Sequence, residues 1–215
     1  MVELLEVFGD DLTVVNAARV SFAKESHELK AGDTKLIQYL ADHNHVTPFF
    51  HPQARFRLRM PIFVAREWYR HQIGFARNEV SRRYVDSEPE FWMPNELRER
   101  DSNKKQGSKD IKIQYNGHCL AKMDKHHEQS IELYNYLLSN NVCPEQARAV
   151  LPQSMMTEFI ETGSLAAYAR LYKLRTDPSA QREIQELAAC VGNLLSEKFP
   201  ISWSALTSGH PSAPV

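Results

Sequence analysis

The sequence predicts an α/β (α+β) protein in which helices outnumber strands, and two observations lead to this class. Residues 54–60 alternate between apolar side chains and arginines, the pattern of a half-buried strand. Residues 115–138 and 178–198 carry apolar residues at helical spacing over long stretches. No Pro/Gly/Ser-rich linker divides the 215 residues, so we expect one domain over residues 1–215.

The N-terminal region is predicted to form a strand followed by two helices. The apolar patterns place them at residues 4–8, 12–22 and 34–43. Asp33 is the expected N-cap of the second helix, because an aspartate side chain accepts hydrogen bonds from the first free N–H groups.

A further helix is predicted to begin at Pro61 and to carry the charged residues that follow. Proline is favoured in a first helical turn, where its missing N–H costs nothing. If this helix continues past residue 69, Arg66 and Arg70 share one face and Glu67 and His71 another.

The second half of the chain is predicted to be mainly helical. We expect a mobile surface loop at about residues 96–110, because this stretch is charged and its only apolar side chain is Leu97. Asp177 and Pro178 are the expected N-cap and first residue of the last helix. The other expected elements are helices at residues 115–138, 144–151 and 164–174 and a strand at residues 155–160.

Composition excludes several classes of protein. The net charge of -1 disfavours a protein that binds nucleic acid chiefly through its phosphates. The three cysteines lack the spacing of a zinc site or a disulfide framework, so we expect reduced thiols and no metal. No apolar stretch reaches the ~18 residues that a membrane span needs. We therefore expect a soluble, intracellular, cytoplasmic protein.

Residues 70–84 hold the densest group of polar side chains, with four arginines among fifteen positions. Arginine grips phosphate with two parallel hydrogen bonds, while Asn78, Glu79 and Ser81 offer acceptors and small donors for a sugar or a base. The segment therefore suits a bound phosphate and heterocycle. The alternative is a nucleic-acid-binding module that uses Arg66 to Arg83 as its basic surface.

The same segment resembles the signature of the flavin-dependent thymidylate synthases. Their pattern is Arg-His-Arg, seven residues, then Ser; here Arg70-His71-Gln72 is followed by eight residues and Ser81, with residues 78–84 reading NEVSRRY. Two departures are the glutamine at Gln72 and the spacer that is one residue longer. Other blocks in family order are residues 18–22, 45–51, 61–68, 147–152 and 174–181.

The resemblance implies a fold, an assembly and a reaction. The fold is an antiparallel or mixed sheet flanked by long helices, with one catalytic domain per chain and a homotetramer whose active sites are shared between subunits. The reaction is the methylation of dUMP to dTMP, with methylenetetrahydrofolate as carbon donor and NADPH-reduced FAD as hydride source.

Carbon C5 of uracil must become nucleophilic before it can be methylated. Unrelated thymidylate synthases add a cysteine thiolate to the ring, but Cys119, Cys143 and Cys190 have no neighbourhood that favours this role. A fixed cation beside the base can instead stabilise an ionised uracil, and the resemblance assigns this role to Arg175. Arg175 also precedes the predicted helix start at Asp177, where N–H groups and the helix dipole favour an anion.

The resemblance also supplies two sets of ligand-binding residues. For dUMP it implies Glu67, Arg70, Glu79, Ser81, Arg82, Arg83, Arg148 and Arg175. For FAD it implies Ser21, His45, Thr47, Arg70, His71, Gln72, Asn78, Glu79, Ser164, Arg170 and Ser179.

Overall fold

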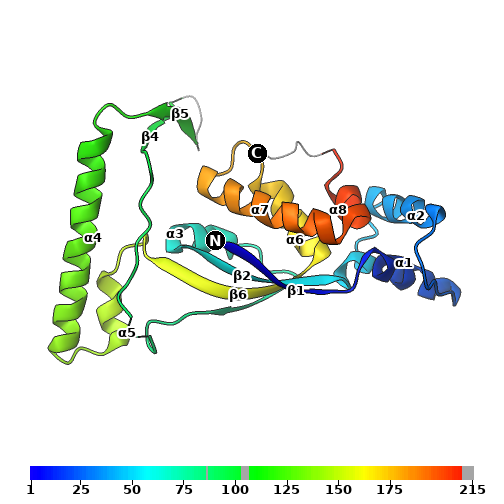
Figure 1. Ribbon diagram of the computed structural model, residues 1–215, viewed down its shortest axis with the longest axis horizontal. Coiled ribbons are helices and arrows are strands. Elements are labelled where there is room, and N and C mark those ends of the chain that lie inside the picture. The colour runs from blue at the N-terminus through cyan, green and yellow to red at the C-terminus, as the bar shows by residue number, and fades with distance from the viewer. Residues whose placement is uncertain (86, 103–106, 210–215) are drawn as a thin grey trace. The chain divides into compact units, whose positions relative to one another are not determined.

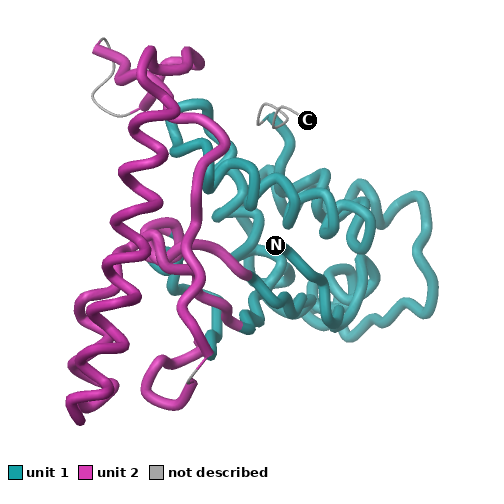
Figure 2. Tube along the Cα trace, turned by 60° about the vertical axis from the view of Figure 1, so that its left-hand side comes forward, with its two compact units in different colours: residues 1–58, 68–78, 160–215 teal, residues 59–67, 79–159 magenta. Residues whose placement is uncertain are grey.

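The computed structural model describes residues 1–85, 87–102 and 107–209, and these residues form two compact units. Unit 1 contains residues 1–58 and 68–78 and the chain from residue 160 onward; unit 2 contains residues 59–67 and 79–159 (Figure 2). Neither unit is a continuous segment, because the chain passes between them several times. The single catalytic domain over residues 1–215 stays a prediction.

A four-stranded antiparallel sheet has the strand order β1-β2-β6-β3. Its strands are β1 (Val2–Phe8), β2 (Gln53–Pro61), β6 (Met156–Ser164) and β3 (Phe75–Glu79). β1 and β2 pair from Val2 opposite Leu58 to Phe8 opposite Gln53, with an irregularity between Leu4 and Glu6. The sequence predicted three of these strands with shifted ends, but it did not predict β3.

Unit 1 contains most of the helices. They are α1 (Asp11–Arg19), α2 (Ala31–Asp42), α6 (Leu165–Arg175), α7 (Arg182–Lys198) and α8 (Pro200–Thr207), with the short 3-10 helices η1 (Val20–Phe22) and η2 (Thr47–Phe50). In Figure 1, α6 and α7 lie over one side of the strands of this unit, and α2 packs beside α8.

The core of unit 1 explains why its helices hold their places. Val14, Ile37 and Phe49 are fully buried in one apolar cluster that joins α1, α2 and η2. The buried carboxylate of Asp11 accepts hydrogen bonds from the N–H groups of Ile201, at 3.0 Å, and Ser202, at 2.8 Å. An acidic side chain thus satisfies free N–H groups in the first turn of α8, a helix that was not predicted from the sequence.

The period-two pattern of β2 is confirmed by its burial. Phe56 and Leu58 are fully buried on one side, whereas Arg55 and Arg57 lie on the partly exposed side. Arg55 pairs with Glu6 of β1 at 2.7 Å.

Unit 2 is built around one long helix, α4 (Asn116–Ser139), which confirms the helix expected at residues 115–138. Its other elements are α3 (Ile62–Trp68, whose last residue belongs to unit 1), the antiparallel pair β4 (Arg98–Arg100) and β5 (Ser108–Lys112), α5 (Pro144–Ala147) and η3 (Arg148–Val150). The loop expected at about residues 96–110 thus contains both β4 and the start of β5. Residues 103–106 of that loop lie outside the described residues.

The helix expected from Pro61 is shorter than predicted. Pro61 is the last residue of β2, and α3 ends at Trp68. The expected shared faces of Arg66 with Arg70 and of Glu67 with His71 are therefore wrong. The chain turns after α3 because Gly74, at φ +85°, adopts a conformation that glycine accommodates without strain.

Two predicted helix starts are also wrong. α2 begins at Ala31 after Lys30, and Asp33 lies inside its first turn, where its carboxylate accepts the Lys30 N–H at 2.9 Å. α7 begins at Arg182, because Asp177 instead closes a local turn by accepting the Ser179 N–H at 2.8 Å. Both aspartates bind a nearby N–H, but neither is the N-cap of a helix.

Candidate active site

The turn between α3 and β3 brings much of the signature segment to the N-terminal end of α6, within unit 1. The Ser164 N–H donates to the Gly74 carbonyl at 3.0 Å, which ties the turn to the end of β6. A Cβ at Gly74 would lie 2.9 Å from both Ala167 Cβ and Ser164 Oγ. This close approach and the positive φ explain why a glycine stands in the longer spacer.

His71 and Arg175 meet although they are 104 residues apart in the chain. The Arg175 Nε–H donates to His71 Nε2 at 2.8 Å. His71 is 8% exposed, and Arg175 is the last residue of α6. We expected Arg175 to stand just before a helix N-terminus, but it ends α6, and α7 begins only at Arg182, so that expectation is wrong. The C-terminal end of a helix dipole favours a cation.

Burial and the neighbouring positive charges keep the imidazole of His71 neutral. Its pKa is lowered from 6.5 to about 4, first because burial disfavours the charged form. Four positive charges add to this effect, in decreasing order those of Arg175, Arg170, Arg77 and Arg70. Unit 1 thus holds a cluster of positive charge with a neutral acceptor inside it, a setting that suits an anionic ligand.

Arg77 is held by a buried acid. Its guanidinium forms an ion pair with Glu161 of β6, whose side chain is fully buried. The Trp68 Nε1–H donates to the two Glu161 oxygens at 3.1 and 3.2 Å. Burial raises the pKa of Glu161, whereas Arg77 and the Trp68 hydrogen bond act in the opposite direction.

Aromatic rings enclose the same guanidinium. Its carbon lies 5.3 Å from the centre of the Tyr69 ring and 4.7 Å from that of Phe75. The sequence did not predict roles for Arg77 or Glu161. The strand predicted at residues 155–160 ends before Glu161, and β6 carries a second glutamate at Glu158, so the local sequence does not single out Glu161.

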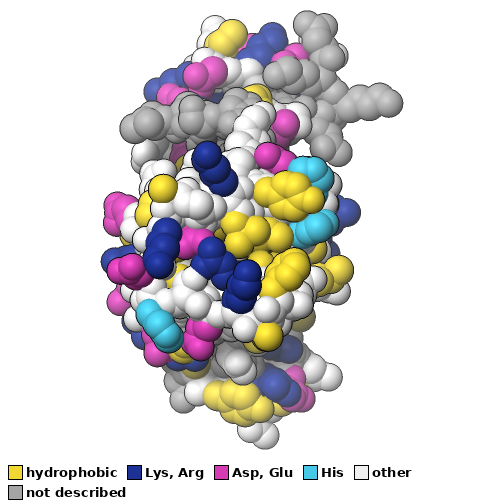
Figure 3. Space-filling view, turned by 90° about the vertical axis from the view of Figure 1, so that its right-hand side faces the viewer, with side chains coloured by type: hydrophobic (Ala, Val, Ile, Leu, Met, Phe, Trp, Pro, Cys, Tyr) yellow, Lys and Arg dark blue, Asp and Glu magenta, His cyan; other side chains and the backbone are white. Residues whose placement is uncertain are grey.

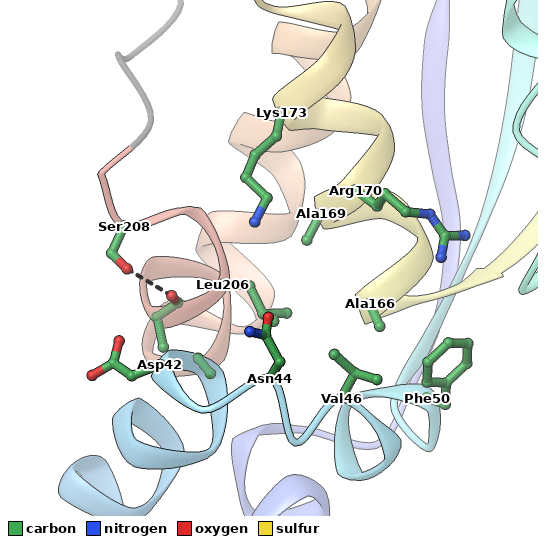
Figure 4. Close-up of a pocket in the computed structure, with 12 residues that line it drawn as sticks. Asp42, Asn44, Val46, Phe50, Ala166, Ala169, Arg170, Lys173, Leu206 and Ser208 are labelled. Carbon is green, nitrogen blue, oxygen red and sulfur yellow. Dashed lines mark hydrogen bonds between the residues drawn. The ribbon is translucent and has the colours of Figure 1, made fainter.

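Arg170 lies on α6 between the turn and a pocket of unit 1. Its Nη2 donates to the Ile73 carbonyl at 2.7 Å, which holds the backbone of the signature segment. The pocket has a volume of about 400 Å³, within the size range of small-molecule sites. In Figure 4, Lys173 points its ammonium group into this pocket, and Val46 and Phe50 lie on the opposite wall.

Three predicted FAD ligands lie on the exposed surface formed by the N-terminal part of unit 1. Ser21 belongs to η1, Thr47 begins η2, and His45 precedes it. His45 lies edge-on to Tyr39, with ring centres 6.0 Å apart. In Figure 3, histidine and apolar side chains lie side by side on the visible face, with lysine and arginine side chains close by. Among the described residues, no hydrogen bond joins these three side chains to His71.

The remaining predicted ligands of unit 1 have mixed surroundings. Gln72 and Asn78 are exposed, as is Arg70. Ser164 is the N-cap of α6, and its Oγ accepts the Ala167 N–H at 3.2 Å. Ser179 donates its hydroxyl to Asp177 at 2.6 Å. The hydroxyls of the two serines thus already make local hydrogen bonds.

Unit 2 carries most of the residues predicted to bind dUMP. Arg83 donates from its N–H and its Nε to Ser81 Oγ, both at 3.4 Å, and pairs with Glu145 at 3.6 Å. Arg148 is exposed at the start of η3. The pair of Arg83 with Glu145 is exposed at both ends, so it is weak and can yield to a phosphate.

The other three predicted dUMP ligands in unit 2 differ in their partners. Arg82 donates to the Ser87 carbonyl and, at 3.3 Å, to the Glu88 carbonyl. Glu79, at the end of β3, accepts the Thr157 hydroxyl at 2.5 Å. Glu67 lies on α3 and is half-buried. Arg82 thus holds the loop that follows the signature.

Other classes of site find no support in the described residues. In the described parts of the chain, no group of histidines, cysteines and acids is arranged to hold a metal ion. Cys119, Cys143 and Cys190 are free thiols, and Cys143 and Cys190 are exposed. Within the same parts, no helix is long and apolar enough to cross a membrane.

Comparisons with known proteins agree with the fold and with the signature segment. The family described as "Thymidylate synthase complementing protein" matches residues 3–201. A flavin-dependent thymidylate synthase of Thermosipho africanus is 39% identical over 94% of this chain and 88% of its own. One from Thermus thermophilus is 35% identical over 95% of this chain and 74% of its own.

Solved structures give the same result. A crystal structure of the UMP/dUMP methylase PolB from Streptomyces cacaoi with 5-Br dUMP has a TM-score of 0.84 and 29% identity, covering 100% of this chain and 97% of that one. The same methylase with 5-Br UMP gives a TM-score of 0.86. The fold is thus that of a nucleotide-methylating enzyme class. The chain belongs to the flavin-dependent thymidylate synthase family and is an enzyme.

Proposed function

We propose that the protein converts dUMP to dTMP, taking the carbon from methylenetetrahydrofolate and the hydride from FAD that NADPH has reduced. The observation that carries this proposal is the hydrogen bond from Arg175 to His71 at 2.8 Å, within a cluster of four arginines. The arginine cluster provides a fixed cation for an anionic base and further cations for phosphates. The nucleic-acid-binding alternative is not proposed, because the family is that of an enzyme.

The residues of unit 1 fit a flavin nucleotide. A pyrophosphate needs cations and N–H donors, and Arg70 is an exposed arginine in the signature turn. The backbone approaches closely at Gly74, where a Cβ would clash, and the nearby pocket has apolar walls beside Arg170 and Lys173. Bound FAD supplies the reducing equivalents for the methyl group. The residues of unit 1 proposed to hold it are Ser21, His45, Thr47, Arg70, His71, Gln72, Asn78, Ser164, Arg170 and Ser179; Glu79, which the resemblance also implies, belongs to unit 2.

Arg175 is proposed to stabilise negative charge on the uracil ring of dUMP. A guanidinium stays protonated at working pH, so it can hold an ionised base and raise electron density at C5. Its position is set before the substrate arrives, since His71 holds its Nε. No protein thiolate takes part in this proposal.

The residues proposed to hold the rest of dUMP share hydrogen-bonding groups for phosphate and ribose. A dianionic phosphate pairs well with arginine forks, and carboxylates accept from ribose hydroxyls. The set is Glu67, Arg70, Glu79, Ser81, Arg82, Arg83 and Arg148. We propose a homotetramer in which these residues and those for FAD come from more than one subunit.

The test is an activity assay with each substrate omitted in turn. The purified protein should show flavin absorbance, and NADPH oxidation should yield dTMP only when dUMP and methylenetetrahydrofolate are both present. UMP is assayed in parallel, because the similar enzyme of Streptomyces cacaoi is a UMP/dUMP methylase. A colourless protein that makes no dTMP but binds nucleic acid would favour the binding-module alternative.

A further inference from the structure

We propose that His71 is a positioning residue for Arg175. His71 Nε2 accepts the Nε–H of Arg175 and thereby fixes the orientation of the guanidinium. The inference deepens the proposed function, because it assigns the orientation of the base-activating cation to a second side chain. It differs from the FAD-binding role predicted for His71, because the partner here is an arginine and not the flavin.

The geometry supports an orienting role because one partner is firmly held and the other is intrinsically mobile. His71 is 8% exposed, and its backbone N–H donates to the Trp68 carbonyl at 3.2 Å. Arg175 is half-buried at the end of α6 and has four rotatable side-chain bonds. Fixing such a side chain costs up to ~2 kcal/mol of rotamer entropy. The hydrogen bond at 2.8 Å holds the Arg175 guanidinium in one orientation before the substrate binds.

The chemistry of the pair defines which tautomer of His71 is required. Because Arg175 has no acceptor, His71 Nε2 must carry a lone pair, so the ring proton is on Nδ1. Burial, and then the neighbouring charges of Arg170, Arg77 and Arg70, disfavour the imidazolium form, in which this acceptor is lost.

The first test separates positioning from flavin binding by comparing two variants. His71→Leu removes the acceptor, whereas His71→Gln keeps an acceptor at a similar distance from the backbone. With FAD at saturation, we expect His71→Leu to lower kcat by about 10- to 100-fold, the effect of a misplaced catalytic group, with a smaller change in the KM for dUMP. His71→Gln should recover most of that loss. If both variants lose activity only at limiting FAD and reach the wild-type kcat at saturating FAD, His71 is a flavin ligand only and the proposal is wrong.

The second test is a double-mutant cycle with Arg175→Lys. Lysine keeps the charge but has no guanidinium, so there is no Nε–H for His71 to hold in place. We expect His71→Leu to have little further effect in the Arg175→Lys background, although it slows the wild-type enzyme. An undiminished effect in that background would overturn the proposal.

The third test uses the wild-type protein, so it does not depend on variants that fold or on turnover. Nitrogen NMR of the FAD-bound protein, with the His71 signal assigned by its loss in His71→Gln or His71→Leu, reports which ring nitrogen carries the proton. We expect the Nδ1–H tautomer at neutral pH. An Nε2–H tautomer or an imidazolium would refute the pairing. If the tautomer is as expected but the wild type makes no dTMP, the proposed function fails while the contact stands.

Discussion

Arg175 and His71 form a contact between two residues that lie far apart in the sequence. One lies at the end of α6 and the other in the turn after α3, and a hydrogen bond of 2.8 Å joins them. The family resemblance named both residues, His71 in the signature and Arg175 in the block at residues 174–181, but it did not predict their contact. Sequence spacing cannot report a contact between residues 104 positions apart, because the path of the chain between them decides it.

Replacing Arg175 by alanine should abolish most dTMP formation and leave the fold intact. Removing one preorganised charge-stabilising donor costs ~3 kcal/mol of barrier, or about 100-fold or more in kcat. Turnover under saturating dUMP, with circular dichroism and flavin absorbance as controls, checks this. A folded, flavin-loaded Arg175→Ala protein with near wild-type turnover would show that Arg175 does not stabilise charge on the uracil ring.

His71 should make the free energy of unfolding depend on pH on the acidic side of neutrality. Its pKa is about 4 in the folded protein and 6.5 when unperturbed, so the unfolded chain takes up a proton first as pH falls. The stabilising contribution is therefore complete above the unfolded value and is lost as pH falls from 6.5 toward 4.

Urea unfolding at about pH 7 and about pH 5 measures this effect. The loss of stability between the two should be smaller in His71→Gln than in the wild type. His118→Gln is the control, because His118 is exposed on α4. An identical pH dependence in the wild type and in His71→Gln would show that the neutral imidazole is not required by the fold.

The strands and helices explain how the two departures from the family signature are accommodated. The longer spacer forms a turn at Gly74 and then β3, in which Arg77 reaches Glu161 of β6. Gln72 stands at the third signature position and is exposed, while Arg77 is one of the four arginines that lower the pKa of His71. Positive charge near His71 thus comes from within the spacer.

Breaking the Arg77–Glu161 pair should strongly destabilise the protein. Either Arg77→Met or Glu161→Met leaves a buried charge without its partner, which costs about 3–5 kcal/mol of the free energy of unfolding. The double variant should lose much less than the sum of the two. Chemical denaturation measures all three.

The matched control for this pair is Glu6→Gln on the same sheet. Glu6 pairs with Arg55 at 2.7 Å, but both side chains are at least 40% exposed, so the loss should stay below ~1 kcal/mol. If Glu161→Met and Glu6→Gln cost the same, the buried pair does not stabilise unit 1 as described.

Sequence patterns predicted those elements whose signals are local. The alternation in β2 and the apolar stripe of α4 are properties of the segments themselves, and both elements appear as expected. β3 was missed because the sequence of Phe75–Glu79 is mostly polar and becomes a strand by pairing within the sheet. The caps at Asp33 and Asp177 were misassigned because an aspartate binds nearby N–H groups equally well in a first turn or an isolated turn.

The whole molecule is proposed to work as a homotetramer with shared sites. FAD, dUMP and a folate must converge, and sites of this kind form preferentially where surfaces meet. Exposed apolar side chains in unit 1 include Val20, at 72% exposure, and Phe22, at 75%, next to the predicted FAD ligand Ser21. Such residues are ready to be covered by another chain.

Mixing two inactive variants tests the shared site. Arg175→Ala and Arg83→Ala subunits, combined under conditions that allow exchange, should regain part of the activity if the two arginines of one site come from different chains. Each variant assayed alone serves as a control. Sedimentation that shows an active, FAD-bound monomer would refute the assembly, whereas failed complementation would place both arginines of a site on one chain.

Reduced flavin bound to this protein is proposed to drive the methylation of dUMP. The most direct measurement is a single turnover without NADPH: enzyme reduced under anaerobic conditions is mixed with dUMP and methylenetetrahydrofolate labelled in its methylene carbon. We predict labelled dTMP in an amount equal to the bound flavin, formed as the flavin is reoxidised. The absence of labelled dTMP, or its formation by flavin-free protein at the same rate, would show that bound flavin is not the reductant.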